Sequence, residues 1–332
     1  EITDFAHKSR PRRKVYAAVN TLVLENELRD VIGLLGVIAD IGIDAVIVQD
    51  PGLVRLAKKY FPSLRLHAST QMAVHNLAGV NALERIGFKR ATLARELTVD
   101  EVRSICSAAG IEIETFIHGA LCYSYSGLCL FSSMLRGRSG NRGRCQYPCR
   151  DNFGGKEQKY SFSMKDFSGV DSVEDLGKAG VACLKIEGRK KSPLYVAAVT
   201  SFYRKMLDGK FDDESRKALE ADIRTIFSRK WTKLYLASRE NRDVLDTEML
   251  GHRGTPVGVV DKSVRAGPGH AALRFKTSRE IEVHDGMQID IPGEGRPYGF
   301  AVDRLKTAGA GRGPVFTAPA GSVVEIDLPH DH

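Results

Sequence analysis

Four of the six cysteines of this 332-residue chain lie within one short stretch, in the pattern C-x6-C-x15-C-x3-C. They are Cys122, Cys129, Cys145 and Cys149. Thiolates gathered in this way are the ligands of iron–sulfur clusters and of structural zinc sites. Zinc sites usually contain a C-x2-4-C pair, which C-x6-C is not, so the spacing favours an iron–sulfur cluster while leaving zinc open. The polar Arg/Gly/Ser surroundings argue against the alternative that these cysteines are buried packing residues, the role we assign to Cys106 and Cys183.

The composition indicates a globular protein with a modest excess of positive charge. Lys and Arg number 49 against 41 Asp and Glu, which gives a net charge of +8. This excess favours an acidic partner, such as RNA or an anionic small molecule, although a mildly basic surface is the simpler alternative. Clustered cysteines indicate a reducing compartment, here the cytoplasm, and no apolar run has the length of a membrane span.

Short apolar runs alternate with helical periodicity through the first third of the chain. Strands are predicted at 14–20, 44–49, 64–69, 90–95 and 112–117, and helices at 28–41, 52–60, 72–86 and 99–109. This alternation predicts an α/β fold with a parallel sheet, and a repeat of about 20–25 residues suits a TIM-like (β/α) barrel. A doubly wound open sheet is the alternative, but no G-x-G-x-x-G turn follows an early strand.

Polar residues gather where the predicted strands end. They are Asn20, Gln49–Asp50, His67 with 69–71, Arg95–Glu96, and His118. Active sites of β/α barrels lie at the carboxyl ends of the strands, so we expect these residues to share one site.

Changes in composition and hydrophobic pattern along the chain predict three regions. Residues 1–200 form the barrel domain with a cysteine-rich insertion at 119–150, residues 201–250 a helical connector, and residues 251–332 a small β domain that resembles a barrel. After the cysteines we expect strands at 160–165 and 182–187 and helices at 193–207 and 213–227. In the β domain we expect strands at 256–260, 271–275, 286–291, 299–302 and 322–326. A closed barrel needs eight strands, so either a segment is missing before Glu1 or the barrel is incomplete.

The segment 116–150, F-I-H-G-A-L-C…S-G-x-C…G-R-S-G-N-R-G-x-C-x-x-P-C-R, resembles the signature of the collagenase-like peptidase family U32. K-I-E-G-R at 185–189 resembles a second hallmark of that family, S-M-K-D at 163–166 its connecting strand, and H-x-S-T-Q at 67–71 its strand-end motif. The resemblance spans 14–199. Family members begin upstream of the present first residue, so we expect the chain to lack the first strands of the barrel.

This resemblance implies a β/α barrel in which Cys122, Cys129, Cys145 and Cys149 hold a 4Fe–4S cluster. It also implies oxygen-independent hydroxylation of transfer RNA, ribosomal RNA or the ubiquinone ring. We expect the chain to belong to the RNA-modifying branch, for which the resemblance implies prephenate as oxygen donor. The peptidase name is older, and some members are described as collagenases.

Around the thiols we assign His67, His118 and Glu187 as catalytic candidates. Lys185 and Arg189 are candidates to clamp a carboxylate such as that of prephenate, because the planar guanidinium of Arg matches it. Asn20 and Gln71, together with Arg138 and Arg142 from a basic group of five arginines, complete the predicted substrate site. The alternative interpretations are a salt-bridged barrel rim and histidines that complete hydrogen-bond networks. For the arginine group, which is Arg136, Arg138, Arg142, Arg144 and Arg150, the alternative is that it offsets the negative charge of the cluster.

Two other functions stay open. Proteolysis lacks support from motifs, since neither a G-x-S-x-G elbow nor an H-E-x-x-H zinc motif occurs. A non-catalytic binding protein with a structural metal is the third possibility.

Overall fold

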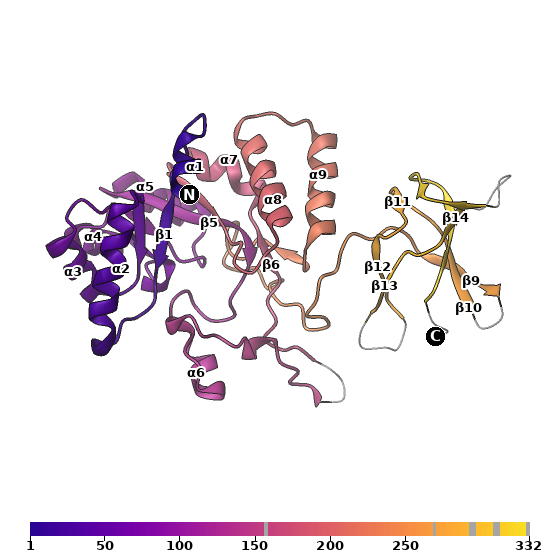
Figure 1. The fold of residues 1–332 in the computed structure, drawn as a ribbon, viewed down its shortest axis with the longest axis horizontal. Coiled ribbons are helices and arrows are strands. Elements are labelled where there is room, and N and C mark those ends of the chain that lie inside the picture. Colours follow the sequence, from indigo (N-terminus) through magenta and orange to yellow (C-terminus); the bar gives the residue numbers. More distant parts are fainter. Residues whose placement is uncertain (156–158, 268–269, 292–296, 308–312, 330–332) are drawn as a thin grey trace. The chain divides into compact units, whose positions relative to one another are not determined.

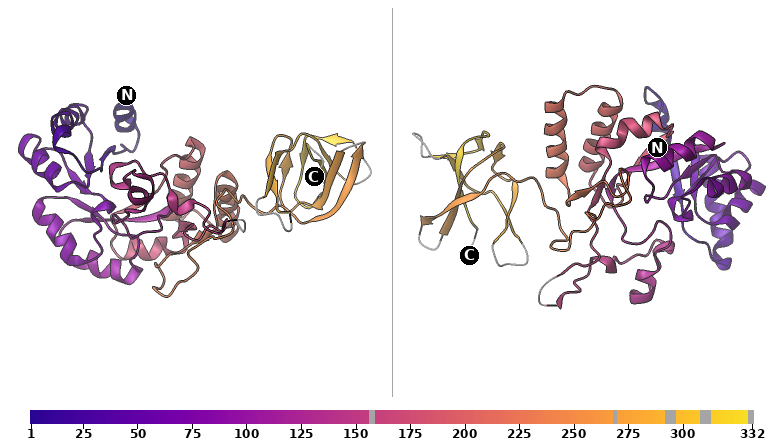
Figure 2. Two further views of the ribbon diagram at one scale, coloured as in Figure 1. Left: turned by 90° about the horizontal axis from the view of Figure 1, so that it is seen from below. Right: turned by 180° about the vertical axis from the view of Figure 1, so that it is seen from behind.

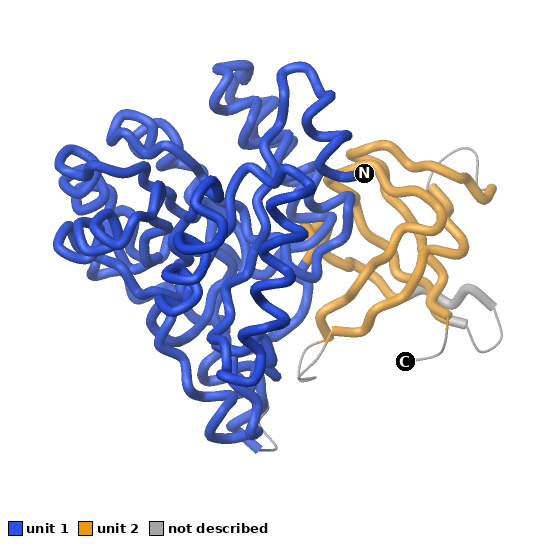
Figure 3. The backbone as a smooth tube through the Cα atoms, turned by 60° about the vertical axis from the view of Figure 1, so that its left-hand side comes forward, with its two compact units in different colours: residues 1–155, 159–253 blue, residues 156–158, 254–332 orange. Residues whose placement is uncertain are grey.

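The structure is a computed structural model that describes residues 1–155, 159–267, 270–291, 297–307 and 313–329. The chain divides into two compact units, residues 1–155 with 159–253, and residues 156–158 with 254–332 (Figure 3). Residues 201–250, which we expected to form a connector, therefore belong to the first unit. Across the described residues, no helix combines the length and apolar character needed to cross a bilayer.

The first unit is built on one eight-stranded, mostly parallel sheet (Figure 1). Its strands are β1 (Tyr16–Val19), β2 (Ala45–Val48), β3 (Leu66–Ala68), β4 (Arg90–Thr92), β5 (Glu112–Ala120), β6 (Asp166–Ser168), β7 (Cys183–Ile186) and β8 (Trp231–Thr232). The strands β1 to β5 pair in chain order and in parallel, and β7 then pairs in parallel with β5. Parallel neighbours place all their carboxyl ends at the same edge of the sheet.

Helices follow the strands and cover the sheet (Figures 1 and 2). They are α1 (Ile2–Lys8), α2 (Leu28–Asp40), α3 (Pro51–Tyr60), α4 (Leu77–Ile86), α5 (Val99–Ala108), α6 (Phe131–Arg136), α7 (Val173–Lys178), α8 (Pro193–Leu207) and α9 (Asp213–Ile226). Short 3-10 turns lie at Glu25–Glu27, Thr70–Met72, Gly140–Arg142, Pro148–Arg150 and Val170–Ser172.

The predicted parallel α/β architecture is confirmed, whereas closure of the sheet into a barrel is not observed. Among the described strands, β1 pairs only with β2, so one edge of the sheet stays open. At the other side β5 is shared: Glu114 to His118 pair with β7, while His118 to Ala120 pair with the antiparallel β6. The two halves of the long strand β5 thus pair with different strands, the first half with β7 and the second half with β6.

The core lies between the sheet and its helices. Fully buried side chains include Leu35, Val46, Val48, Leu53, Val54, Val80, Phe88, Ile117, Leu176 and Val199. Burial of apolar side chains is the main favourable contribution to such a fold, at about 25 cal/mol per Å².

Two predicted elements are displaced, for local reasons. The helix predicted at 72–86 starts only at Leu77, because Asn76 caps α4 by accepting from the backbone N–H of Gly79 at 2.8 Å. The strand predicted at 160–165 is wrong: this segment contains a turn and one isolated bridge, from Met164 to Leu245, and β6 begins at Asp166.

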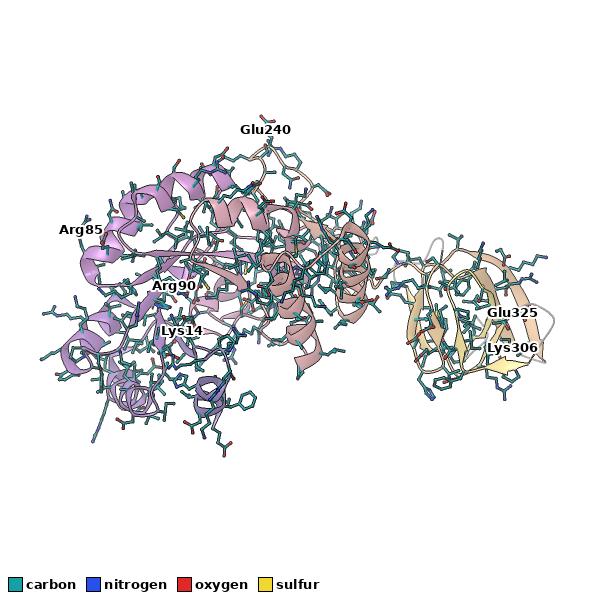
Figure 4. The ribbon with its side chains drawn as sticks, turned by 90° about the horizontal axis from the view of Figure 1, so that it is seen from above. Lys14, Arg85, Arg90, Glu240, Lys306 and Glu325 are labelled. Atoms are coloured by element: carbon teal, nitrogen blue, oxygen red, sulfur yellow. The ribbon has the colours of Figure 1, made fainter. Side chains whose placement is uncertain are left out.

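The second unit is a small antiparallel β structure. Its five-stranded sheet contains β15 (Pro314–Val315), β14 (Leu305–Thr307), β17 (Val323–Asp327), β10 (His270–Lys276) and β9 (Val260–Gly267) in that order. Two further pairs join β11 (Ile281–Glu282) to β16 (Thr317–Ala318) and β12 (Gly286–Ile289) to β13 (Tyr298–Ala301). Lys306 and Glu325, labelled in Figure 4, are cross-strand neighbours. The predicted strand at 256–260 falls mostly before β9, and the other four predicted strands correspond to β10, β12, β13 and β17.

Candidate functional site

The cysteine-rich segment begins where β5 ends. Gly119 of that strand has a φ of +114°, and a Cβ added there would lie 2.6 Å from the carbonyl oxygen of Glu187. Glycine is therefore required for the chain after β5 and the chain after β7 to approach this closely. Cys122 follows two residues beyond Ala120, at the carboxyl edge of the sheet.

A second set of contacts fastens the segment to loops after β3 and β4. Gly127 has a φ of +80°, and a Cβ added there would lie 2.4 Å from the carbonyl oxygen of Gln71. Next to it, the backbone N–H of Ser126 donates to Glu96 Oε1 at 2.8 Å, and Ser126 Oγ accepts from the backbone N–H of Arg95 at 3.2 Å. The stretch between Cys122 and Cys129 is thereby held at the ends of two neighbouring strands.

The stretch before Cys145 is fastened at two further strand ends. Arg142 forms a bidentate ion pair with Glu27, after β1, and lowers the pKa of that carboxyl group to about 2. Arg189, after β7, donates from Nη2 to the carbonyl of Gly143 at 3.3 Å. The cysteine segment is therefore attached, at the carboxyl edge of the sheet, to the loops that follow four strands: β1, β3, β4 and β7.

Electrostatic coupling shows that the four thiols lie near one another. Desolvation raises the pKa of Cys122, Arg95 lowers it, and Cys129 and Cys145 raise it further. The pKa of Cys149 is also raised, first by desolvation and then, against the effect of Arg150, by the other three thiols. All four thiols are free, and Cys122 retains exposed surface. That these four cysteines bind one metal cluster stays a prediction.

Single-ion sites and iron–sulfur clusters place different demands on four thiols. Within the part of the chain that the structure describes, no three His, Cys, Asp or Glu side chains are arranged around one ion. A zinc ion needs all its sulfurs at about 2.3 Å, whereas each thiolate of a 4Fe–4S cluster binds a different iron, so its ligands stand farther apart. Four cysteine thiolates are chemically suitable ligands for either kind of site.

Two partly buried arginines would balance the charge that thiolates bring. The guanidinium of Arg95 is 11% exposed, lies 3.7 Å from the centre of the Phe116 ring and is 4.0 Å from Glu187 Oε2. Burial lowers the pKa of Arg95, and the thiol of Cys122 together with Glu187 counteracts that shift. Arg150 donates to Ser163 Oγ at 2.7 Å and to the carbonyl of Met164 at 2.6 Å, so it joins the cysteine segment to the chain before β6.

The arginines of the cysteine segment divide into paired and unpaired ones. Arg136 is paired with Asp151 at 2.5 Å, and Arg142 with Glu27. Arg138 and Arg144 are exposed, and neither makes a side-chain hydrogen bond or ion pair with any described residue. Of the two arginines that we predicted as substrate ligands, Arg138 is thus available and Arg142 is engaged in holding the segment.

His118 lies on the other face of β5, against α8. Its Nδ1 is 3.1 Å from the hydroxyl of Tyr203, and its ring packs edge-on against Trp231 at 5.3 Å between centroids. Burial lowers its pKa to about 4. A register shift between Phe116 and His118 explains why this side chain leaves the face of Glu114 and Phe116.

His67 lies in a buried polar network away from the carboxyl edge. Its ring contacts Tyr16 at 4.9 Å, and burial followed by the charge of Arg90 lowers its pKa to about 4. It lines a cavity of about 60 Å³ with residues that precede or begin the strands, among them Lys14 and Arg90, which Figure 4 labels. The structure thus places His67 apart from the residues that hold the cysteine segment.

Lys185 belongs to the same polar network rather than to a pair with Arg189. Glu114 Oε1 accepts from Lys185 Nζ at 2.9 Å and from Thr92 Oγ1 at 2.9 Å, and Glu114 Oε2 accepts from Arg90 at 3.2 Å. Burial alone would raise the pKa of Glu114, but Lys185 and the hydrogen bonds lower it.

The remaining predicted residues lie at the carboxyl edge. Asn20 follows β1, and Gln71 Oε1 accepts from Ser69 Oγ at 3.3 Å. Glu187 accepts from the backbone N–H of Arg189 at 2.8 Å and lies near both Arg95 and Cys122. The sequence identified Arg95 and Glu96 only as strand-end residues, because their partners are distant in sequence, and Arg150 only as one of the basic group of arginines.

Comparison with known proteins shows the family to which the chain belongs. A sequence profile described as "Peptidase family U32" matches residues 1–246. The chain is 36% identical to the 23S rRNA 5-hydroxycytidine C2501 synthase of Escherichia coli (strain K12) over 93% of its own length. It spans about half of that relative, 48% of its length.

Two further relatives differ in their described activities. The chain is 30% identical to tRNA hydroxylation protein P of Escherichia coli (strain K12), with 96% of this chain and 82% of the relative covered. It is also 30% identical to a protein named collagenase from Porphyromonas gingivalis (strain ATCC BAA-308 / W83), with 68% of this chain and 60% of that protein covered. By the extent of the profile match and of these similarities, the chain belongs to peptidase family U32.

Proposed function

We propose that this protein takes part in the oxygen-independent hydroxylation of a base in ribosomal or transfer RNA. The observation that carries the proposal is its similarity, over 93% and 96% of its length, to relatives named for such modifications of rRNA and tRNA. The exposed, unpaired Arg138 and Arg144 beside the thiols supply the positive charge that an RNA substrate needs. An RNA substrate of this kind would place the protein in the cytoplasm.

A 4Fe–4S cluster is the cofactor that this proposal requires. Cys122, Cys129, Cys145 and Cys149 would hold it, and when bound it would supply electron transfer. Around it, the backbone N–H of Tyr147 donates to Cys145 Sγ at 3.3 Å, and Arg95 and Arg150 bring positive charge to Cys122 and Cys149. Hydrogen bonds and charges of this kind tune the potential of a cluster.

Prephenate is the oxygen donor that we propose, and Arg189 is the residue best placed for one of its carboxylates. Arg189 is exposed, and its one side-chain hydrogen bond to the described residues is to the carbonyl of Gly143. Lys185 is committed to the buried carboxylate of Glu114, so its part in binding would be indirect.

Glu187 is the strongest of the three catalytic candidates. Its carboxylate lies between Arg95 and the backbone of Arg189 and influences the thiol of Cys122. It is therefore positioned to accept or hold a proton beside the thiols. The buried, neutral rings of His67 and His118 suit supporting roles instead.

The test is a direct assay of RNA modification. Protein purified without oxygen is incubated with prephenate and with RNA from cells that lack the modification, and nucleosides are analysed by mass spectrometry. A new hydroxylated nucleoside that depends on the protein supports the proposal. Unmodified RNA, together with gelatin hydrolysis by metal-free protein, would replace it with the peptidase function.

A further inference from the structure

Tyr147 and Lys190 share an uncommon backbone conformation at the cysteine site. Their φ angles are +57° and +61°, in the left-handed region that bulky side chains rarely adopt. The two residues are 43 positions apart in the sequence, since 190 − 147 = 43, yet Lys190 Nζ lies 5.2 Å from the centre of the Tyr147 ring. Two separate loops therefore each accept backbone strain where their side chains meet.

Local contacts hold both residues in this conformation. The backbone N–H of Tyr147 faces Cys145 Sγ, and the 3-10 turn Pro148–Arg150 starts directly after it. On the other loop, the backbone N–H of Lys191 donates to the carbonyl of Gly188 at 3.0 Å, which closes the turn that contains Lys190. Strain that the surroundings enforce in this way is found most often at functional sites.

Both side chains remain exposed despite this constraint. Tyr147 is 43% exposed, and Lys190 has no ion pair with any described residue. An exposed aromatic face beside an uncompensated cation can stack on one flat group and attract one anionic group at the same time. A nucleotide with an unpaired base offers both groups.

We infer that Tyr147 and Lys190 form a stacking platform that receives an unpaired base of the RNA substrate beside the cysteine site. This inference rests on the proposed function and names the surface that binds its substrate. The base stacks on the exposed face of the Tyr147 ring, while Lys190, with Arg144 on the same loop as Tyr147, faces the flanking phosphates. Single-stranded or extruded bases are the form of RNA that aromatic side chains bind.

Charge favours RNA over a protein as the occupant. The chain carries a net charge of +8, and Lys190 at the platform and Arg144 on the loop of Tyr147 make no ion pair with any described residue. A protein partner at this surface would need to be strongly acidic. It would compete with RNA for the surface, so a competition experiment with labelled RNA can detect it.

The chain contains a matched control for this platform. Tyr60, the last residue of α3, is 51% exposed, and Lys59 Nζ lies 5.0 Å from the centre of its ring. The pair has the same residue types, a similar distance and a similar exposure, but α3 ends on the side where β3 starts, opposite the cysteine segment. A general effect of losing an exposed tyrosine beside a lysine would appear equally in both.

The experiment measures binding of a short, fluorescently labelled single-stranded RNA by anisotropy, using the full chain purified without oxygen. Tyr147→Asn removes the ring but keeps a residue that tolerates a positive φ, Tyr147→Phe keeps the ring, and Tyr60→Asn is the control. Tyr147→Asn should weaken binding by roughly 10-fold, as expected from loss of one stacked base, with Tyr147→Phe and Tyr60→Asn within about 2-fold of wild type. Lys190→Asn should flatten the dependence of binding on salt.

The outcomes separate this inference from the proposed function. If wild-type protein binds no RNA, the RNA-directed function itself fails. If wild type binds and Tyr147→Asn binds equally well, the platform is wrong while the function stands. The visible spectrum of each variant is recorded, and weak binding by Tyr147→Asn that accompanies loss of metal would assign Tyr147 a structural role and overturn the inference. Polyglutamate that displaces the labelled RNA more effectively than unlabelled single-stranded RNA at equal charge concentration would assign the surface to an acidic protein.

Discussion

Two polar regions on the same sheet differ in how their charges are used. In the inner network the charged groups that contact Glu114 are paired: Arg90 binds Glu112 and Glu114, and Lys185 binds Glu114. At the cysteine segment, four free thiols lie beside cations that have no partner among the described residues, and beside two residues with left-handed backbone. Both regions are rich in ionisable residues, but only in the second are thiols and cations left available to bind a ligand.

This difference between paired and unpaired charges indicates that the cysteine segment, and not the network around Glu114, is the reactive region. Fully paired buried charges rigidify a sheet, and their perturbed pKa values report packing more than reactivity. Unpaired cations, desolvated thiols and enforced backbone strain at the strand ends are features that only a ligand would complete. The following variants test this contrast, beginning with the largest expected effect.

Loss of one thiol should abolish the function of the cysteine segment. Cys145→Ser is expected to lose bound iron and all RNA hydroxylation, because a cluster with three protein ligands is exposed to loss. Cys106→Ala, which removes a thiol on α5, should keep both. Iron content and nucleoside analysis are measured on the two variants, and an active, iron-free Cys145→Ser protein would contradict the account.

Loss of the central carboxylate should damage the inner network instead. Glu114→Ala leaves Lys185 without its partner and Arg90 with one, so we expect a loss of about 3–5 kcal/mol in the free energy of unfolding. Glu112→Ala, at a side chain that is 41% exposed, should cost about 1 kcal/mol. Urea unfolding provides both values, and equal losses would show that the network is not organised around Glu114.

The tether between the cysteine segment and β3 should depend on Gly127. Gly127→Ala brings a Cβ against the carbonyl of Gln71, whereas Gly137→Ala meets no atom within 4 Å at a similar positive φ. Gly137→Ala should cost about 1–2 kcal/mol for its backbone conformation alone, and Gly127→Ala more, with a lower iron content. If the two variants have the same stability and the same iron content, the close approach at Gln71 does not hold the segment.

Lowering the pH should reduce the free energy of unfolding through the buried histidines. The pKa of His118 is about 4 in the folded chain and about 6.5 when unfolded, so the unfolded state takes up a proton first as the pH falls. Stability is therefore complete above about pH 6.5 and declines toward pH 4, by about 2 kcal/mol at pH 5. His118→Phe should remove that part of the decline, with His67 contributing the rest. Urea unfolding at neutral pH and near pH 5 measures it, and an unchanged slope in the variant would mean that His118 is not buried in its neutral form.

Much of the fold was predictable because its signals are local. The five strands before the cysteines are short apolar runs, and helices such as α3 and α5 have clear starts at Asp50 and Thr98. Closure of the sheet was not predictable, since it depends on which strands pair with β5, and the pairing of β5 with both β6 and β7 leaves no local mark.

The site was predictable only in part, for the same reason. The four cysteines are identified by their own spacing. By contrast, strand-end Asp50 and Ser69 turned out to cap helical turns, and His118 was expected at the site although a register shift turns it toward Tyr203. Arg95 and Glu96 hold the thiols through partners some 20 to 90 positions away, such as Phe116, Ser126 and Glu187, and no sequence pattern reports such contacts.

The central claim is that four cysteines at the carboxyl edge of the sheet hold an iron–sulfur cluster. The most direct test is to purify the protein without oxygen, record its visible spectrum and determine iron and sulfide. We predict broad visible absorption and about four irons with matching sulfide per chain. Zinc alone, or no metal in a folded protein, would contradict the account and leave the cysteine segment as a structural element.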